Sequence, residues 1–359
     1  MTKQLQIVAV FIIVSLSYGY LLYPSIIYSL TDTTHWLVVL SQGFIQLILV
    51  WLYIKGLKRF PQHTLLDIYS KMGKWMTLLF LFPFALNLIA LITFSVRMHT
   101  ETILSIFLPR TPYWSILLLL LFISAYTAIK GFDTILRSAI FIVLLILFII
   151  LLNTFSSFVN YDVYNIASDK HVSIAFLLNP KFLTLIGFSS FLFLGFITND
   201  KPLTFPPFMI ASIGVIVILL SFIYIPLLIF GHETVVTMPH PLLEATDSIN
   251  IGWFVFNRQT MFLGITLIGF VILASAVMLW MIGQIMQSLL PKSKRKNSFW
   301  IIIFTTFSLI AALLLPNQAV AEKYFLWGVG IQAFFMAIIP LTIFIYGFAS
   351  KRGGVKHEN

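Results

Sequence analysis

Long apolar stretches without charged residues follow one another along almost the whole chain. Ten stretches contain no Asp, Glu, Lys or Arg, and each has at least 18 residues. A helix of about 20 apolar residues crosses the hydrocarbon core of a bilayer, and the alternating strands of a membrane barrel are absent from the sequence. The pattern therefore predicts an all-α membrane protein with ten transmembrane helices. They are expected over residues 4–31, 33–54, 75–96, 111–129, 138–161, 182–199, 202–232, 259–291, 297–321 and 324–350.

Composition supports this class of protein. The chain has 359 residues, of which 60% are hydrophobic and 9% are charged, whereas soluble domains are about 25% charged. This excludes a soluble globule, and since no water-soluble segment separates the spans, we expect a single transmembrane domain over residues 1–359. The basic residues occur in short loops between apolar runs and not on a soluble face, so the net charge of +10 does not indicate a nucleic-acid partner.

The residues that bind metals or cofactors are scarce. There is no Cys, and none of the seven His has a partner at the helical spacing of metal ligands. No glycine-rich nucleotide loop is present, and no nucleophile, base and orienting group converge in one segment. We therefore expect no metal, no cofactor and no enzymatic activity.

The basic residues predict the orientation in the membrane. With ten spans both termini lie on one side, and that side carries 16 of the 22 Lys and Arg residues. Cytoplasmic loops are enriched in Lys and Arg. We therefore expect cytoplasmic N- and C-termini in an integral multi-pass membrane protein.

The first helix of each half of the chain carries residues that interrupt helices. Five spans per half predict an inverted repeat, of about 4–161 and about 182–350, as in transporters of the LeuT type, whose first helices are broken near the ligand. The first span contains Gly19 and Pro24, and the sixth contains Gly187 and Gly195. An alternative interpretation is that these glycines only allow close helix packing.

The polar groups inside the predicted spans are neutral, and they predict a site for a small zwitterion. Backbone N–H groups released near the first break would hold a carboxylate, and carbonyl groups released near the second would accept from an ammonium. The candidate ligand-binding residues are Tyr18, Gly19, Tyr20, Asn87, Ser190, Phe191 and Gly195.

Two further features are placed at the edges of the spans. Arg97, Asp200 and Lys201 stand at span ends, where an interfacial location is expected. The loop of residues 232–251 contains two prolines and three acidic residues. It is expected to form either a solvated connector, or a short surface helix or lid.

Several local motifs, in order along nearly the whole chain, resemble one family. The positions that carry the resemblance are Gly19, Pro24, Trp36, Phe60, Pro61, Thr64, Leu65, Gly73, Lys74, Leu108, Pro109, Thr111, Pro112, Gly131, Arg137 and Arg258. With these residues the chain resembles the B subunit (GerAB-like) of spore germinant receptors, within the amino acid/polyamine/organocation transporter superfamily.

The resemblance implies a sensor of a small nutrient, often an amino acid, in the inner membrane of a dormant spore. It also implies two partners, an A-type membrane subunit and a C-type lipoprotein, beside the lipid bilayer. Two alternatives remain: a secondary amino acid transporter, which would need no buried acid if sodium were held by backbone carbonyls, and a purely structural membrane subunit.

Overall fold

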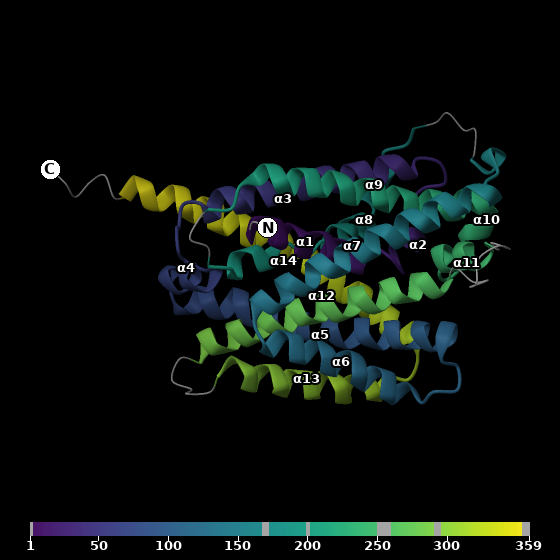
Figure 1. The fold of residues 1–359 in the computed structure, drawn as a ribbon. Coiled ribbons are helices and arrows are strands. Elements are labelled where there is room, and N and C mark those ends of the chain that lie inside the picture. The colour runs from purple at the N-terminus through teal and green to yellow at the C-terminus, as the bar shows by residue number, and fades with distance from the viewer. Residues whose placement is uncertain (1–2, 167–171, 199–201, 250–259, 291–295, 354–359) are drawn as a thin grey trace.

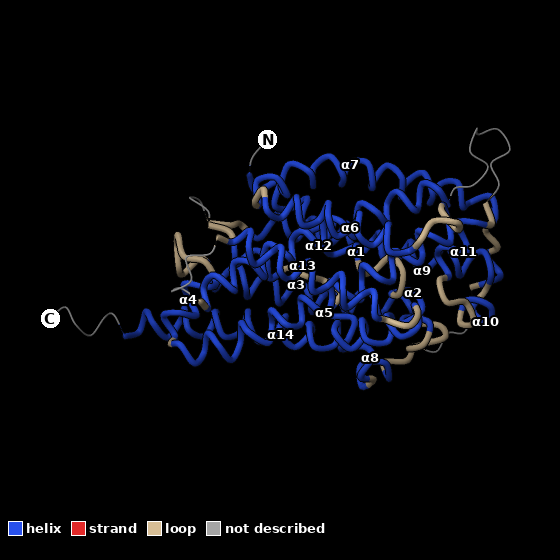
Figure 2. The backbone as a smooth tube through the Cα atoms, turned by 90° about the horizontal axis from the view of Figure 1, so that it is seen from below, coloured by secondary structure: helices blue, strands red, loops and turns tan. Residues whose placement is uncertain are grey.

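The protein is a bundle of helices that run side by side along one axis (Figures 1 and 2). The computed structural model describes residues 3–166, 172–198, 202–249, 260–290 and 296–353, and these residues contain no strand. The short helix α4 lies at one end of the bundle, and α10 and α11 lie at the other (Figure 1). We name these the α4 end and the α11 end.

The helices vary widely in length. In chain order they are α1 (Lys3–Ser17), α2 (Tyr23–Tyr28), α3 (His35–Leu57), α4 (Leu65–Met72), α5 (Lys74–Phe107), α6 (Tyr113–Ile129), α7 (Phe132–Ser157), α8 (Pro180–Gly187), α9 (Phe205–Phe230), α10 (His232–Val235), α11 (Pro241–Asp247), α12 (Thr260–Leu289), α13 (Asn297–Leu314) and α14 (Gln318–Gly353). Four short 3-10 helices are η1 (Phe158–Asn160), η2 (Val163–Asn165), η3 (Ala175–Leu178) and η4 (Leu192–Phe196).

Seven of the described helices are long and apolar enough to cross a membrane: α3, α5, α7, α9, α12, α13 and α14. Two further apolar helices are shorter, α1 with 15 residues and α6 with 17. The predicted first and sixth spans are each divided into shorter pieces, so they contain no single long helix. Multiple long apolar helices make this a multi-pass membrane protein, while the count of ten crossings stays a prediction.

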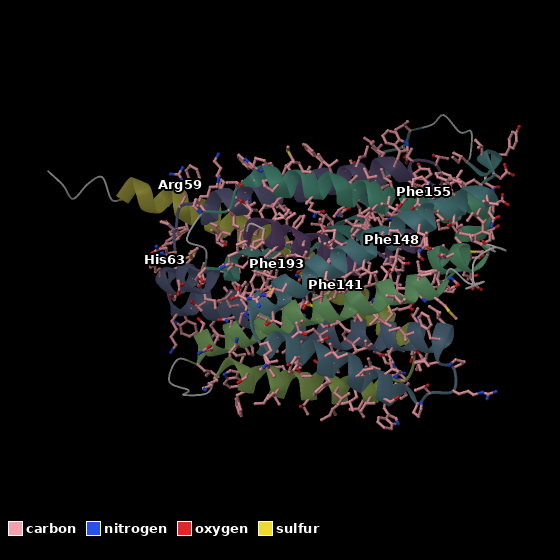
Figure 3. All side chains as sticks on the ribbon, in the orientation of Figure 1. Arg59, His63, Phe141, Phe148, Phe155 and Phe193 are labelled. Atoms are coloured by element: carbon pink, nitrogen blue, oxygen red, sulfur yellow. The ribbon has the colours of Figure 1, made fainter. Side chains whose placement is uncertain are left out.

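The outer surface of the bundle is apolar. Phe141, Phe148 and Phe155 repeat every seven residues along α7, and their side chains are 73%, 63% and 67% exposed (Figure 3). Such a surface is costly in water, but the acyl chains of a bilayer are equally apolar. The exposed faces of the long helices therefore suit contact with lipid.

Local sequence explains where several helices begin and end. Thr64 caps α4, since its hydroxyl accepts from the Asp67 backbone N–H while the Asp67 carboxylate accepts from the Thr64 N–H. Gly73 separates α4 from α5 with a φ of 117°, and Gly131 separates α6 from α7 with a φ of 95°. Both values lie in a region that favours glycine.

Helix α12 forms the centre of the bundle. It packs against α1, α5, α6, α7 and α13, and most of its side chains are buried. Helix α14 packs against α3, α5 and α8. These two helices connect the interrupted segments to the rest of the molecule.

The structure corrects the expectation that Arg97 stands at the end of a span. Helix α5 continues past the apolar stretch to Phe107, so Arg97 lies inside the helix and is 5% exposed. It forms an ion pair with Glu101, and its guanidinium lies 4.3 Å from the ring centroid of Tyr113. The ion pair and the aromatic ring compensate in part for the loss of water, while Nε and Nη1 of Arg97 have no hydrogen-bond partner among the described residues. Asp200 and Lys201 lie outside the described residues.

The loop of residues 232–251 contains the short helix predicted as one of its two alternatives. Helix α11 buries Leu242, Ala245 and Thr246, so it packs into the bundle and is not a solvated connector. Pro241 at its first position suits a helix start, because the first N–H groups of a helix need no internal partner.

Candidate functional site

The first predicted break is present between α1 and α2. Helix α1 ends at Ser17, α2 begins at Tyr23, and residues 18–22 are not helical. Pro24 contributes to the break because it has no N–H with which to bond the Tyr20 carbonyl four residues earlier. All residues from Tyr18 to Pro24 are buried.

The second predicted break follows α8. Helix α8 ends at Gly187, residues 188–191 are not helical, and the chain resumes as the 3-10 helix η4. The sequence here contains Gly187, Ser189 and Ser190, which have weak helix propensity. Residues 187–196 are buried throughout.

The two breaks lie side by side in the interior. The ring of Tyr23, at the start of α2, meets the ring of Phe188 edge-on, with centroids 5.8 Å apart. Phe325 of α14 contacts both segments, 5.2 Å from Tyr18 and 6.4 Å from Phe188 between ring centroids. At membrane depth, irregular backbone is tolerated where protein surrounds it or where it lines a cavity.

Two of the predicted site residues are connected through a third side chain. The Asn87 side-chain amide in α5 donates to the Gln332 carbonyl oxygen in α14 at 2.8 Å. The Gln332 amide lies 3.5 Å from the Ser190 hydroxyl oxygen, at the limit of a hydrogen bond. All three side chains are buried. This chain of contacts joins α5, α14 and the second break.

Phe191 and Gly195 are brought together by Tyr53 of α3. The Tyr53 hydroxyl donates to the Leu192 carbonyl oxygen at 2.9 Å, and its ring lies 5.9 Å from that of Phe191. A Cβ atom at Gly195 would overlap the Tyr53 hydroxyl. Glycine is therefore required for this close approach.

Tyr18 and Tyr20 face different neighbours, although one residue separates them. The Tyr18 hydroxyl contacts the Met278 sulfur at 2.9 Å. Tyr20 packs against Phe222 of α9 and Phe270 of α12. Gly19, between them, faces α9, where a Cβ atom would lie 2.8 Å from a Leu219 methyl carbon. The structure thus divides the predicted residues instead of gathering all of them around one point.

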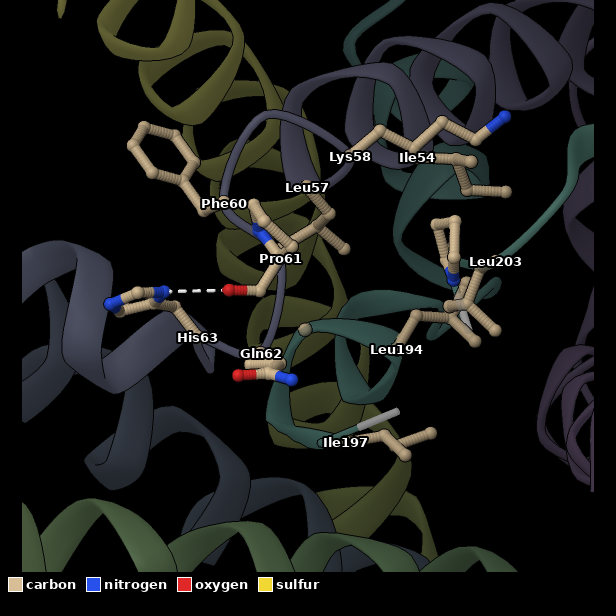
Figure 4. A pocket seen from close by; sticks show the side chains of 12 residues that line it. Ile54, Leu57, Lys58, Phe60, Pro61, Gln62, His63, Leu194, Ile197 and Leu203 are labelled. Atoms are coloured by element: carbon tan, nitrogen blue, oxygen red, sulfur yellow. Dashed lines mark hydrogen bonds between the residues drawn. The ribbon is translucent and has the colours of Figure 1, made fainter. Parts of the chain in front are cut away.

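Gly195 also borders a cavity of about 70 Å³ at the α4 end (Figure 4). Its other walls are the end of α3, the loop of residues 60–63 and the segment from Leu194 to Ile197. The His63 ring donates from Nδ1 to the Pro61 carbonyl oxygen at 2.8 Å, and its Nε2 accepts from Lys71 at 2.6 Å. Gln62 has a φ of 62°, a strained value for a residue other than glycine.

Comparison with known proteins decides the family. The model of a family described as "Spore germination protein" matches residues 2–320. The chain belongs to this spore germination protein family. The chain is also similar to the spore germination protein YndE of Bacillus subtilis (strain 168), with 27% identity over 238 residues. That similarity spans 64% of this chain and 64% of the length of the relative.

Several of the motif positions that resemble the spore germination protein family lie in or next to the loop of residues 60–63 at the α4 end. Phe60 and Pro61, which carried the resemblance, line the cavity beside Gly195. Leu65, another of those positions, is buried, and its Cβ would lie 3.2 Å from a Cβ atom built at Gly195. The loop motif therefore packs against the segment that follows the second break.

Sequence reasoning did not include two side chains that organise the site. Gln332 connects Asn87 to Ser190, and Tyr53 connects Phe191 to Gly195. Gln332 was recognisable as an amide within an apolar span, but its partner lies 245 residues away in the sequence. Tyr53 had no comparable signal, because tyrosine is common near span ends.

Proposed function

We propose that the chain is the membrane subunit of a spore nutrient-germinant receptor that binds a small nutrient, such as an amino acid, and triggers germination. The observation that carries this proposal is the contact between the two buried helix breaks, at Tyr23 and Phe188, in a member of the spore germination protein family. Breaks of this kind supply backbone donors and acceptors at membrane depth.

The proposed architecture is ten membrane crossings in a five-plus-five inverted repeat. The α1–α2 pair forms the first crossing and the α8–η4 pair forms the sixth. The two described breaks support this arrangement because each falls in the first segment of its half. The whole chain is then one transmembrane domain with cytoplasmic termini.

The proposed ligand site is the buried region around the two breaks, bordered by α5 at Asn87 and by α9 at Gly19 and Tyr20. Its candidate residues are Tyr18, Gly19, Tyr20, Asn87, Ser190, Phe191 and Gly195, to which Gln332 is added because it bonds Asn87. Burial supports this choice, since every one of these residues is removed from water.

The proposed setting is the inner membrane of the spore, with an A-type membrane subunit and a C-type lipoprotein as partners. The chain would act by binding and conformational change and not as an enzyme. The competing functions are a secondary amino acid transporter and a structural subunit without a working site.

The test compares spores with and without this chain for germination on single amino acids and sugars. We expect deletion to abolish the response to at least one nutrient. Uptake of the labelled nutrient into growing cells is measured in parallel. Unchanged germination on every nutrient together with reduced uptake would favour the transporter. Unchanged germination and uptake, with lower levels of partner proteins, would favour the structural subunit.

A further inference from the structure

Two polar side chains face a second cavity, on the α9 side of the first break. Tyr20 is 2% exposed and Asn153 of α7 is 6% exposed, and both line the cavity. The Tyr20 hydroxyl and both polar atoms of the Asn153 amide have no hydrogen-bond partner among the described residues. Buried polar groups in proteins are almost always hydrogen-bonded. This pair is therefore available to a ligand.

The other hydroxyl groups around the cavity are already hydrogen-bonded. Thr154 donates to the Ile150 carbonyl at 2.8 Å, Ser157 donates to the Asn153 carbonyl at 2.6 Å, and Thr246 donates to the Leu242 carbonyl at 2.5 Å. These bonds stay within α7 or α11. Tyr20 and Asn153 are thus the groups with free hydrogen-bonding capacity.

The chemistry of the walls defines the ligand group. A carboxamide both donates and accepts, and a phenol hydroxyl does the same. The remaining walls are apolar, including Phe222 and Leu263, and the described lining residues carry no charge. A charged group would be desolvated here without a counter-charge. A hydroxyl or a carboxamide, by contrast, carries no charge and offers both a donor and an acceptor to the free groups of Tyr20 and Asn153.

Helix α11 covers the cavity from the α11 end. It contributes Leu242 and Thr246 to the lining. The cavity measures about 10 Å³, which is room for about one water-sized group. Hydrogen bonds at both ends hold α11 in place: Asp247 Oδ1 accepts from the Thr260 hydroxyl at 2.6 Å, Asn160 donates to the Ser248 carbonyl at 3.2 Å, and the Gln318 amide donates to His240 Nε2 at 2.9 Å. A whole nutrient molecule would fit only if α11 were displaced.

We propose that the Tyr20–Asn153 cavity receives an uncharged hydroxyl or carboxamide group of the nutrient beneath α11. This inference rests on the proposed receptor function and adds to it the chemical class of the group that is recognised. It assigns a binding role to Asn153. It also places Tyr20 in a different part of the ligand site from Asn87, Ser190 and Gln332.

The experiment measures germination with neutral probes and their charged counterparts. The pairs are L-asparagine with L-aspartate and D-glucose with D-gluconate, and L-alanine serves as the probe without a polar side chain. Spores carry the unmodified chain or the variant Tyr20→Phe, Asn153→Leu or Asn153→Asp. Matched controls are Tyr126→Phe, at an exposed tyrosine of α6, and Ser156→Ala, at a serine of α7 that does not line the cavity and donates to the Leu152 carbonyl of its own helix. Immunoblots of spore membranes establish that each chain is present.

We expect at least one neutral probe to trigger germination and its charged counterpart to require at least about tenfold more. Tyr20→Phe and Asn153→Leu should each raise the half-maximal concentration of that neutral probe by about threefold to tenfold, the effect of one lost hydrogen bond. Asn153→Asp should do the same, because it removes the amide donor and introduces a carboxyl group whose charged form is desolvated in the apolar cavity. The two controls should leave the half-maximal concentration unchanged.

Three outcomes would overturn the inference. They are normal responses in both Tyr20→Phe and Asn153→Leu with normal chain levels, equal responses to neutral and charged probes, and a response to L-alanine alone. In each case the receptor function would stand if deletion of the chain abolishes the response. If deletion changes no response, the receptor function itself fails.

Discussion

The Asn87 amide nitrogen lies 2.8 Å from the Gln332 carbonyl oxygen and joins α5 to α14 in the middle of the bundle. Gln332 is in turn 3.5 Å from Ser190 at the second helix break. A displacement of that break would therefore change the contacts of two long helices, α5 and α14. In the proposed receptor function, this connection links a ligand at the breaks to α5 and α14.

A double-mutant cycle tests this connection. Asn87→Leu leaves the Gln332 carbonyl without its donor, and Gln332→Leu leaves the Asn87 amide without its acceptor. We expect the double variant to be more stable than the sum of the two losses predicts, by about 0.6 kcal/mol and at most about 1.7 kcal/mol. Thermal unfolding of the purified chain in detergent measures the coupling. Strict additivity, as expected for Asn87→Leu combined with Ser156→Ala, would show that the hydrogen bond contributes nothing.

The close packing of the glycines at the second break predicts that adding a single methyl group there lowers the stability of the protein. A Cβ atom at Gly187 would overlap the Val329 carbonyl oxygen, and one at Gly195 would overlap the Tyr53 hydroxyl. We expect Gly187→Ala and Gly195→Ala to lower the free energy of unfolding by about 1–3 kcal/mol, with Gly187 the more severe because a backbone atom obstructs it.

Gly214 of α9 is the matched control for the glycine series. A Cβ atom there has nothing within 4 Å. Gly214→Ala should therefore be neutral, or stabilising by up to about 1 kcal/mol, because alanine favours the helix. Equal unfolding temperatures for all three variants would contradict the close packing at the second break.

Helix α11 can be tested as a cover with a single cysteine, because the chain has none of its own. Ala245 is 0% exposed on α11, whereas Glu233 on α10 is exposed. Ala245→Cys should react slowly with a water-soluble maleimide and faster when the activating nutrient is added. Glu233→Cys should react rapidly under both conditions. Rapid labelling of Ala245→Cys without nutrient would mean that α11 does not close the bundle.

Labelling of introduced cysteines also tests the orientation of the protein in the membrane. Lys74 is the first residue of α5, next to α4. Tyr164 is in η2, after the end of α7, and is 97% exposed. If the basic loops are cytoplasmic, an impermeant maleimide added to intact cells should label Tyr164→Cys and spare Lys74→Cys. Permeabilised cells should allow both to react. The reverse pattern in intact cells would invert the predicted topology.

The positions of the helices were largely predictable from sequence, because apolar stretches and their interruptions are local properties. Pro24 indicated the break after Ser17, and Gly187 with its neighbouring serines indicated the second break. The extent of α5 was not predictable in this way. The helix continues through Arg97, whose ion-pair partner Glu101 stands at the i,i+4 spacing of a helix, whereas its contact with Tyr113 in α6 depends on the tertiary structure.

The site was less predictable than the fold, since its contacts join residues far apart in sequence. Tyr18 and Tyr20 looked equivalent, yet one meets Met278 and the other lines the cavity with Asn153. Side-chain direction in a non-helical segment follows no fixed period, unlike that of a helix or a strand. A tertiary structure is needed to separate the two tyrosines.

The central claim is that the chain itself binds a nutrient, and the most direct measurement is its thermal unfolding in detergent with single nutrients added. We predict that the nutrient whose germination response depends on this chain raises the unfolding temperature progressively with concentration. A ligand at 100 times its dissociation constant stabilises the folded state by about 2.7 kcal/mol. An unfolding temperature that does not change, at nutrient concentrations that saturate germination, would contradict the claim.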